Sequence, residues 1–208
     1  MQEKQRGEYQ FDFTGGQLAL DLANTVSRRD HPERRREHLE SFADLISFAR
    51  QANVLSSKQA NELRRYALRH EAEARRAYRK AITLREALYR VFAAIAQHKG
   101  PRDSDFRLIN NCAIEALRNR ELQPVNGGYA WQWRWDGSTA LERILWPAAQ
   151  AAAALLTSDD LKMVRFCEAP DCEWLFLDRS RNRSRRWCDM TTCGNREKAR
   201  RHYQRTHE

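Results

Sequence analysis

The sequence has no apolar run long enough to cross a membrane and no apolar signal-peptide core at its N-terminal end. A transmembrane helix needs about 18 consecutive apolar residues, and the Ala-rich run Trp146–Leu156 is shorter than that. Residues 1–6 read MQEKQR and are mostly polar or charged, unlike a secretory signal. These two absences predict a cytoplasmic protein without a membrane partner.

The sequence also lacks the residue patterns of a recognisable active site. It shows no paired carboxylates, no Ser/His/Asp set and no glycine-rich phosphate loop, since Gly15–Gly16 alone is too short for one. No internal repeat is visible. The sequence therefore predicts a protein that has no catalytic residues and is not an enzyme.

Positive charge is in excess, and it is concentrated near the C-terminal end. The 208 residues carry a net charge of +9, with a mean hydropathy of −0.84 and 41% hydrophobic residues. Residues 179–205 hold 10 Lys or Arg against 2 acidic residues, whereas residues 1–161 are nearly balanced, with 25 against 21. A local excess of this kind favours a polyanionic partner, either nucleic acid or an anionic membrane surface.

Four of the five cysteines follow the pattern Cys167-x4-Cys172-x15-Cys188-x4-Cys193. Two short pairs joined by a connector (residues 173–187) can place four thiolates around one tetrahedral zinc ion. A reducing cytosol favours metal ligands over disulfides, and a closed all-thiolate shell makes the zinc structural. Four unrelated core cysteines, or a set that uses His202 and His207, are the less favoured alternatives.

Basic side chains surround this cysteine pattern. Arginines of the connector are expected to contact phosphates, and those of a final helix to lie nearer a groove. The alternative is an ordinary solvated charged face. The candidate nucleic-acid contacts are Arg181, Arg183, Arg185, Arg186, Arg196, Lys198, Arg200 and Arg201.

The pattern of apolar residues predicts a mainly α protein with a small β-hairpin, an α+β arrangement of two parts. The first part, the body, is residues 1–160, and the second, the finger, is residues 161–208 with a treble-clef-like order of knuckle, hairpin, knuckle and helix. Helices are expected at 17–27, 42–52, 57–97 with a break near 70–73, from 104, at 139–156 with a kink at Pro147, and at 195–204; strands are expected at 9–13, 121–125, 129–135 and 174–177, with a charged linker at 30–37.

Side-chain spacing also predicts which residues are buried. A helical spacing predicts a core face that consists of Leu84, Leu88, Val91, Phe92 and Ile95. The residues expected to point inward from the next helix are Phe106, Ile109, Cys112, Ala113 and Leu117. Trp131, Trp133 and Trp135 are interpreted as core residues rather than as a base-stacking platform.

One polar stripe in the body is a candidate ligand site. Asp21, Asn24, Thr25 and Arg28 have the spacing i, i+3, i+4 and i+7, which would place them on one side of a helix. They could line a pocket for a small-molecule effector. They could equally form a buried hydrogen-bond network that docks the helix on the aromatic hairpin.

Two segments resemble a known family. Residues 187–196, WCDMTTCGNR, together with 167–172 and 174–178, resemble the CGNR zinc finger, and residues 13–25 resemble the start of the ABATE domain. The resemblance implies a mainly bacterial, stress-induced transcription regulator, with a DNA-binding finger and a sensing or partner-binding body. In this motif Gly194 is expected to allow a tight turn, Asn195 to cap the helix, and Arg196 to bond the finger or a phosphate.

The sequence therefore predicts a zinc-dependent, DNA-binding transcription regulator. Two alternatives stay open: a zinc module that binds RNA or protein, and a small-molecule enzyme whose body is braced by a structural finger.

Overall fold

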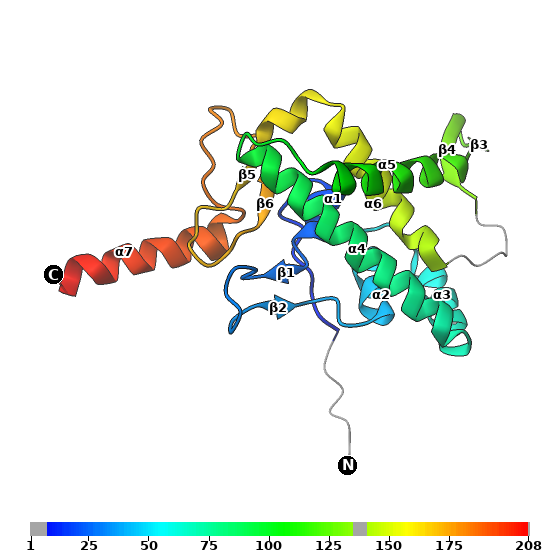
Figure 1. Cartoon of the computed structure of the whole chain (residues 1–208), viewed down its shortest axis with the longest axis horizontal. Helices are drawn as coiled ribbons and strands as arrows, with labels where there is room; N and C mark the ends of the chain where they lie inside the picture. The colour runs from blue at the N-terminus through cyan, green and yellow to red at the C-terminus, as the bar shows by residue number, and fades with distance from the viewer. Residues whose placement is uncertain (1–7, 135–140, 208) are drawn as a thin grey trace, which may run out of the picture.

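The computed structural model describes residues 8–134 and 141–207, and helices dominate it (Figure 1). The longest helix, α4 (Glu71–Ala96), runs through the centre of the body. The helices around it are α1 (Leu18–Ala23), α2 (Phe42–Gln51), α3 (Ser57–Arg69), α5 (Asp103–Arg118) and α6 (Trp146–Leu156), with the short 3₁₀ helices η1 (Leu141–Leu145) and η2 (Asp159–Met163). This arrangement confirms the mainly α fold class.

The strands of the described residues form three small antiparallel sheets. They are β1 (Val26–Ser27) with β2 (Arg36–Glu37), β3 (Arg120–Val125) with β4 (Gly128–Trp133), and β5 (Val164–Phe166) with β6 (Leu175–Leu177). The β3–β4 hairpin agrees with the sequence pattern, and its register pairs Glu121 with Gln132. Gly127 has a φ of +88° in its turn, a conformation that glycine adopts without strain.

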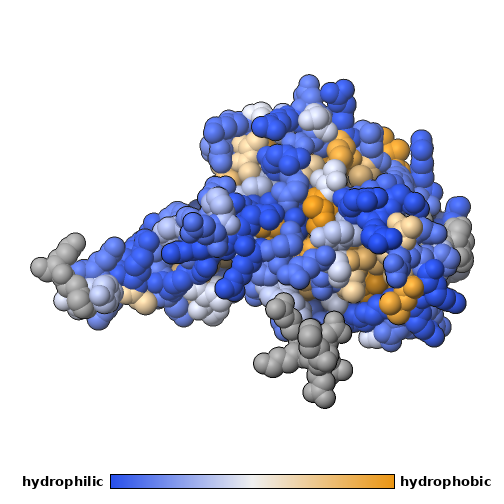
Figure 2. Space-filling view, turned by 60° about the horizontal axis from the view of Figure 1, so that its bottom comes forward, coloured by the Kyte–Doolittle hydropathy of each residue, from blue (hydrophilic) through white to orange (hydrophobic). Residues whose placement is uncertain are grey.

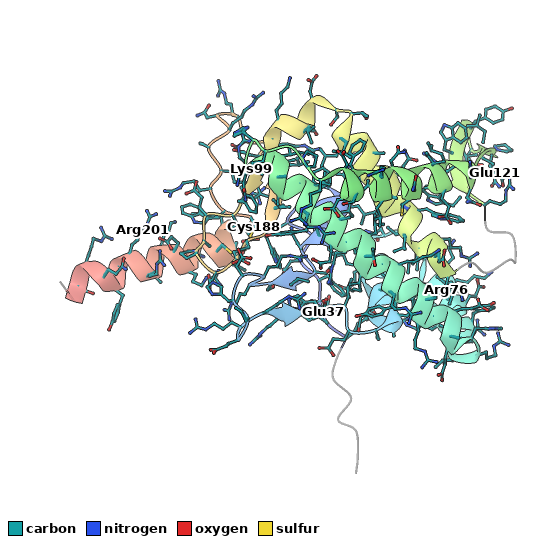
Figure 3. All side chains as sticks on the ribbon, in the orientation of Figure 1. Glu37, Arg76, Lys99, Glu121, Cys188 and Arg201 are labelled. Carbon is teal, nitrogen blue, oxygen red and sulfur yellow. The ribbon has the colours of Figure 1, made fainter. Side chains whose placement is uncertain are left out.

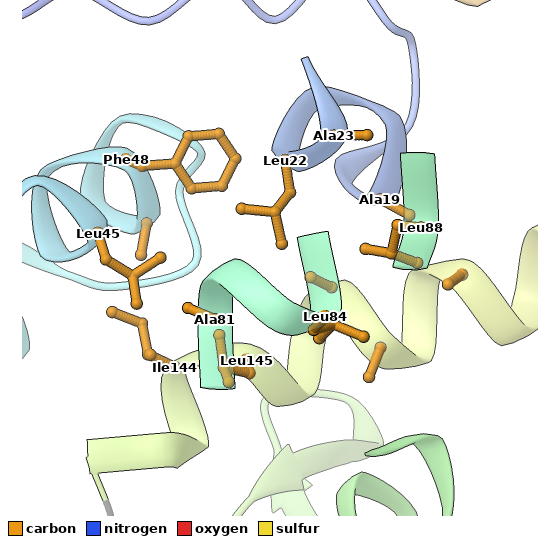
Figure 4. Packing of buried hydrophobic residues seen from close by; sticks show 14 of the residues in the cluster. Ala19, Leu22, Ala23, Leu45, Phe48, Ala81, Leu84, Leu88, Ile144 and Leu145 are labelled. Carbon is orange, nitrogen blue, oxygen red and sulfur yellow. The ribbon is translucent and has the colours of Figure 1, made fainter. Parts of the chain in front are cut away.

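The core of the body is built on one face of α4. Leu84, Leu88, Val91 and Phe92 are at most 1% exposed, as their helical spacing predicts. Figure 4 shows side chains of α1 and α2 and of the η1–α6 segment gathered around this face. Burial of one such leucine contributes about 1.5–3 kcal/mol to stability.

Local signals set several helix boundaries. Ser41 caps α2 in a capping box with Asp44. Ser56 caps α3 in the same way, with Gln59 as its partner. The predicted break in the long helical segment is confirmed at His70, whose φ of −130° and ψ of 55° are not helical.

The predicted strand at residues 9–13 is wrong, since no strand in the described residues pairs with this segment. The segment is irregular; its Phe11 amide donates to Gln51 Oε1 at 2.9 Å, and the Phe11 ring packs edge-on against Phe48. The helix predicted for 17–27 ends at Ala23. The following residues form β1, which pairs with β2 inside the segment predicted to be a linker.

The segment predicted to be one helix at 139–156 changes type beside Pro147. The 3₁₀ helix η1 ends at Leu145 and α6 begins at Trp146. Pro147 lies in the first turn of α6, where proline needs no backbone hydrogen bond.

One expectation about burial is wrong. Phe106 and Leu117 are 47% and 55% exposed, because α5 buries the stripe through Ile109 and Ala113 instead.

The tryptophans of the β-hairpin do not all join the core. Trp131 is 57% exposed, which makes its core assignment wrong. Trp133 is half-buried and lies 6.0 Å, centroid to centroid, from the ring of Trp146. Trp135 lies outside the described residues, as do residues 139 and 140 of the helix predicted to start at 139. None of the helices in the described ranges is long and apolar enough to span a membrane.

Candidate metal centre and nucleic-acid surface

The four cysteines of the finger meet in one buried cluster. The sulfur atoms of Cys167, Cys172, Cys188 and Cys193 all lie within 4.8 Å of one another. The Sγ–Sγ distances are 3.5 Å between Cys172 and Cys188 and 3.6 Å between Cys188 and Cys193. A tetrahedral site with Zn–S bonds of about 2.3 Å has edges of about 3.8 Å, whereas a disulfide is about 2.05 Å long. The cluster therefore fits one zinc ion.

Backbone hydrogen bonds shape the first knuckle. The amide of Cys167 donates to Trp174 O at 2.8 Å, across the end of the β5–β6 hairpin. The amide of Cys172 donates to Ala169 O at 3.1 Å and closes the turn between the two ligands. Glu173 then reverses the chain with a φ of 61°. These contacts bring the two sulfurs to the same side of the hairpin.

The second knuckle is a single π-helical turn, η3 (Met190–Gly194), that continues into α7 (Asn195–His207). Asp189 caps it, because its carboxylate accepts from the amides of Thr191 and Thr192. Hydrogen bonding to Thr191 is the main reason that the pKa of Asp189 lies below its usual value. Asn195, predicted to be the cap, instead donates its side-chain amide to Thr191 O at 3.1 Å.

Gly194 lies close to the side chain of Met190. A Cβ atom at this position would lie 2.5 Å from Met190 Sδ, so the flexible and exposed Met190 side chain would have to move to make room for it.

Asp178 supports the connector through local hydrogen bonds. It is fully buried, and its carboxylate accepts from the amides of Ser180 and Arg185 at 3.0 Å. An Asp two residues before a Ser is an Asx-turn signal, and it could have been recognised in the sequence.

The zinc site is structural, because its shell is closed. Four cysteine ligands fill a tetrahedron and leave no position for substrate. Bound zinc would cross-link the two knuckles and stabilise a segment too small to fold on apolar burial alone. Other contacts support the ligands: the Cys188 amide hydrogen bonds to Cys167, and Arg196 Nη2 lies 3.5 Å from Cys193 Sγ.

The finger is joined to the core of the body. Leu175 and Leu177 of β6 are at most 2% exposed and belong to the same apolar cluster as α4. Asn24 hydrogen bonds the Leu175 backbone twice, as donor at 2.8 Å and acceptor at 2.9 Å. The Trp174 indole donates to Val26 O at 3.0 Å.

The predicted polar stripe does not lie on one helix, because α1 ends before Asn24. Asp21 is 7% exposed and accepts from the Gly15 amide at 2.8 Å. Its burial raises its pKa to about 7. Thr25 is also buried; its hydroxyl donates to Leu22 O. These side chains and Asn24 hold α1 to its own loop and to β6, not to the aromatic hairpin.

Arg28 lies apart from this network. Its φ is 56°, and its guanidinium pairs with Asp171 at 3.5 Å. Asp171 also pairs with Arg196 at 2.8 Å. Together with Arg36 of β2, Arg28 and Arg196 line a hollow of about 250 Å³ beside the cysteine cluster. Arginines of the body and of the finger thus share one surface.

The connector arginines divide into two groups. Arg185 donates to the backbone oxygens of Trp187 and Cys188 and lies 4.6 Å from the Phe176 ring centroid. Arg186 pairs with Glu168. Arg181 and Arg183 are exposed, and neither forms an ion pair with the described residues.

Helix α7 extends away from the body into solvent (Figures 1 and 2). It carries Lys198, Arg200 and Arg201, all exposed, and Figure 3 shows Arg201 far from the cysteine cluster. Arg200 and Arg201 pair with Glu197 at 3.0 and 3.1 Å but remain half exposed.

Two sequence families match the chain, and together they cover most of it. The family described as "CGNR zinc finger" matches residues 163–206. The ABATE family, described as "Putative stress-induced transcription regulator", matches residues 16–159. The curated proteins contain no match. The chain therefore belongs to the ABATE family and ends in a CGNR zinc finger with one structural zinc site.

Proposed function

We propose that this protein regulates transcription by binding duplex DNA through its finger, with α7 as the main contact. The observation that carries the proposal is the position and charge of α7. The helix leaves the body and presents five Lys or Arg residues and one acidic residue over 13 positions. A helix that is polar all round has no face to bury in its own fold, and a cationic helix can enter the major groove.

The exposed basic residues take two roles in this proposal. Arg181 and Arg183 of the connector contact phosphates and set the position of the finger. Lys198, Arg200 and Arg201 lie on α7 and reach the groove. The other three candidates, Arg185, Arg186 and Arg196, use their guanidinium groups to hold the finger together, so their part in binding is indirect.

The β1–β2 hairpin extends the same cationic surface. Arg34, Arg35 and Arg36 are exposed, and Arg36 lines a hollow with Arg196, at the base of α7. If α7 occupies a groove of the DNA, the phosphates along one side of that groove would contact this hairpin. The DNA-binding surface in our proposal therefore includes part of the body.

The body acts as the regulatory part. Because β6 is buried in the core of the body, a change in packing around α1 or α4 reaches the second strand of the finger hairpin. The family description of a transcription regulator favours DNA over RNA or protein as the partner. It also favours a regulator over an enzyme, as does the closed ligand shell.

The proposal can be tested by selecting bound sequences from random DNA duplexes with the full-length, zinc-loaded protein. The wild type should enrich a short motif. A variant with Lys198, Arg200 and Arg201 all changed to Gln should enrich none. The matched control changes Arg65, Arg69 and Arg75 to Gln, which removes the same charge from the far side of the body. Equal enrichment by both variants, or preferential binding of structured RNA, would overturn the proposal.

A further inference from the structure

Helices α4 and α5 form a V that is closed near their connection and open at the other end. At the closed end, Arg90 donates twice to the carboxylate of Asp105, at 2.8 and 2.6 Å. Away from it the two helices separate (Figure 1), and the η1–α6 segment covers the bottom of the gap. The result is a cleft of about 650 Å³, within the range of small-molecule sites.

The floor of the cleft is apolar. It is formed by Leu145, Trp146 and Ala149, with Leu108 of α5 beside them. Trp146 is 7% exposed, and its Nε1–H is buried without a hydrogen-bond partner among the described residues. Trp146 therefore contributes its ring, and not its N–H, to the floor of the cleft.

The walls of the cleft are cationic. Arg76, Arg79 and Lys80 line it from α4, and Arg107 lines it from α5. Two acidic residues lie there too: Glu115, and Glu142, which pairs with Lys80 and with Arg76.

Two of these cations are available to a ligand. Within the described part of the chain, the guanidinium groups of Arg79 and Arg107 form no ion pair. Both residues line the cleft, from opposite helices, and arginine binds carboxylate and sulfonate groups through paired hydrogen bonds. The cleft thus offers an apolar base and two unneutralised charges.

We propose that this cleft binds a small organic anion with a flat apolar body, such as an aromatic carboxylate or sulfonate, and that this anion is the effector of the regulator. The apolar part packs on Leu145 and Ala149, and the anionic group pairs with Arg79 and Arg107. The effector role rests on the regulatory function proposed above for the body. Binding itself does not depend on DNA.

Anilinonaphthalene sulfonate is a suitable probe, because it combines flat rings with one sulfonate. Its neutral analogue phenylnaphthylamine has the same rings without the charge. Fluorescence titration of the full-length, zinc-loaded protein should show at least about tenfold tighter binding of the sulfonate, the gain expected from one good charged contact. In Arg79→Gln/Arg107→Gln the difference between the two probes should largely disappear. Arg118→Gln, on the same helix as Arg107 but outside the cleft, should behave like the wild type.

Cys112 reports directly on the occupied site. It lines the cleft and is the only cysteine outside the zinc cluster. Burial raises the pKa of its thiol, so alkylation by N-ethylmaleimide is best followed at alkaline pH, with the labelled peptide identified by mass. A saturating concentration of the sulfonate probe should slow this alkylation at least about tenfold, because the occupied cleft excludes the reagent.

A second groove supplies the control for location. It lies between α2, α3 and α4 and includes the exposed Leu68. Arg79 lines this groove as well, whereas Arg107 lines only the first cleft. The proposal is wrong if Leu68→Ser abolishes probe fluorescence and the probe does not slow the alkylation of Cys112, because the probe then binds in the second groove. Equal affinity of both probes for the wild type would also overturn it. Neither result bears on DNA binding, which these measurements do not involve.

Discussion

The side-chain amide of Asn24 forms two hydrogen bonds with the backbone of Leu175, as an adjacent strand would. Its Nδ2 donates to the carbonyl at 2.8 Å, and its Oδ1 accepts from the amide at 2.9 Å. Asn24 follows α1 of the body, and Leu175 opens β6 of the finger. Both residues are buried. Asn24 therefore gives the backbone amide and carbonyl of Leu175 hydrogen-bond partners inside the core that the body and the finger share.

Changing Asn24 to Ala should therefore destabilise both parts of the chain. The variant leaves the amide and the carbonyl of Leu175 buried without partners, which costs about 1–3 kcal/mol for each group. Urea denaturation should show the loss, and chelator should remove zinc from the variant at a lower concentration. Asn110→Ala, at an exposed site on α5, should change stability by less than about 0.5 kcal/mol. Normal zinc retention by Asn24→Ala would contradict the coupling.

Zinc content should depend on the cluster and not on Cys112. Metal analysis should give one zinc per wild-type chain and about one for Cys112→Ser, but far less for Cys188→Ser. Because β6 contributes to the core of the body, zinc removal should lower the melting temperature of the whole protein rather than melt the finger alone. If the melting temperature of the body is unchanged after complete removal of zinc, the core shared by the body and the finger contributes little to stability.

Asp21 should make the protein less stable as pH rises. Its folded-state pKa is about 7, while an unfolded Asp has a pKa near 3.9. Between these values the folded state holds a proton that the unfolded state has lost. The free energy of unfolding therefore falls by up to about 1.4 kcal/mol per pH unit, and the penalty is complete above about pH 7.

Denaturation of Asp21→Asn and of the wild type across this range isolates that contribution. The stability of the variant relative to wild type should rise from about pH 4 to about pH 7 and then level off. Asp159→Asn removes a carboxylate whose side chain is 97% exposed, and its curve should run parallel to the wild type. Parallel curves for Asp21→Asn as well would contradict the raised pKa.

Two neighbouring arginines should give opposite results. Arg185→Ala removes hydrogen bonds to two backbone carbonyls and packing on Phe176, so it should lower stability by about 1–3 kcal/mol. Arg183→Ala should leave stability within about 0.5 kcal/mol of wild type and weaken binding to cognate and random DNA alike. The reverse pattern, in melting and in DNA titrations, would contradict the roles assigned here.

Signals that act over a few residues made much of this fold predictable. The cysteine spacing predicts a cluster because each pair closes a short loop. The neighbouring strands expected at 121–125 and 129–135 predict the β-hairpin. Each of these outcomes depends mainly on the local chain.

Interactions between distant segments could not be predicted in this way. Asn24 and Leu175 are 151 positions apart, and no local pattern links an asparagine to a strand in another part of the chain. The alternation of aromatic with other residues around Trp131 predicts a strand that has one aromatic face. It does not show whether other parts of the chain pack on that face. The ion pairs of the finger arginines could not be predicted for the same reason. Asp171 lies far from Arg196 in the sequence, and Glu168 lies far from Arg186.

The most direct test of the central claim is a salt titration of duplex DNA binding by the full-length, zinc-loaded protein, followed by fluorescence anisotropy. Log affinity should fall linearly with log salt between about 50 and 200 mM, and a variant that removes one phosphate-binding side chain, such as Arg183→Gln, should reduce the slope by about 0.9. The Lys198/Arg200/Arg201→Gln variant should bind much more weakly than the wild type, while the Arg65/Arg69/Arg75→Gln control keeps its affinity. If the α7 variant binds duplex DNA as tightly as the wild type at low salt, the finger does not bind DNA through this helix.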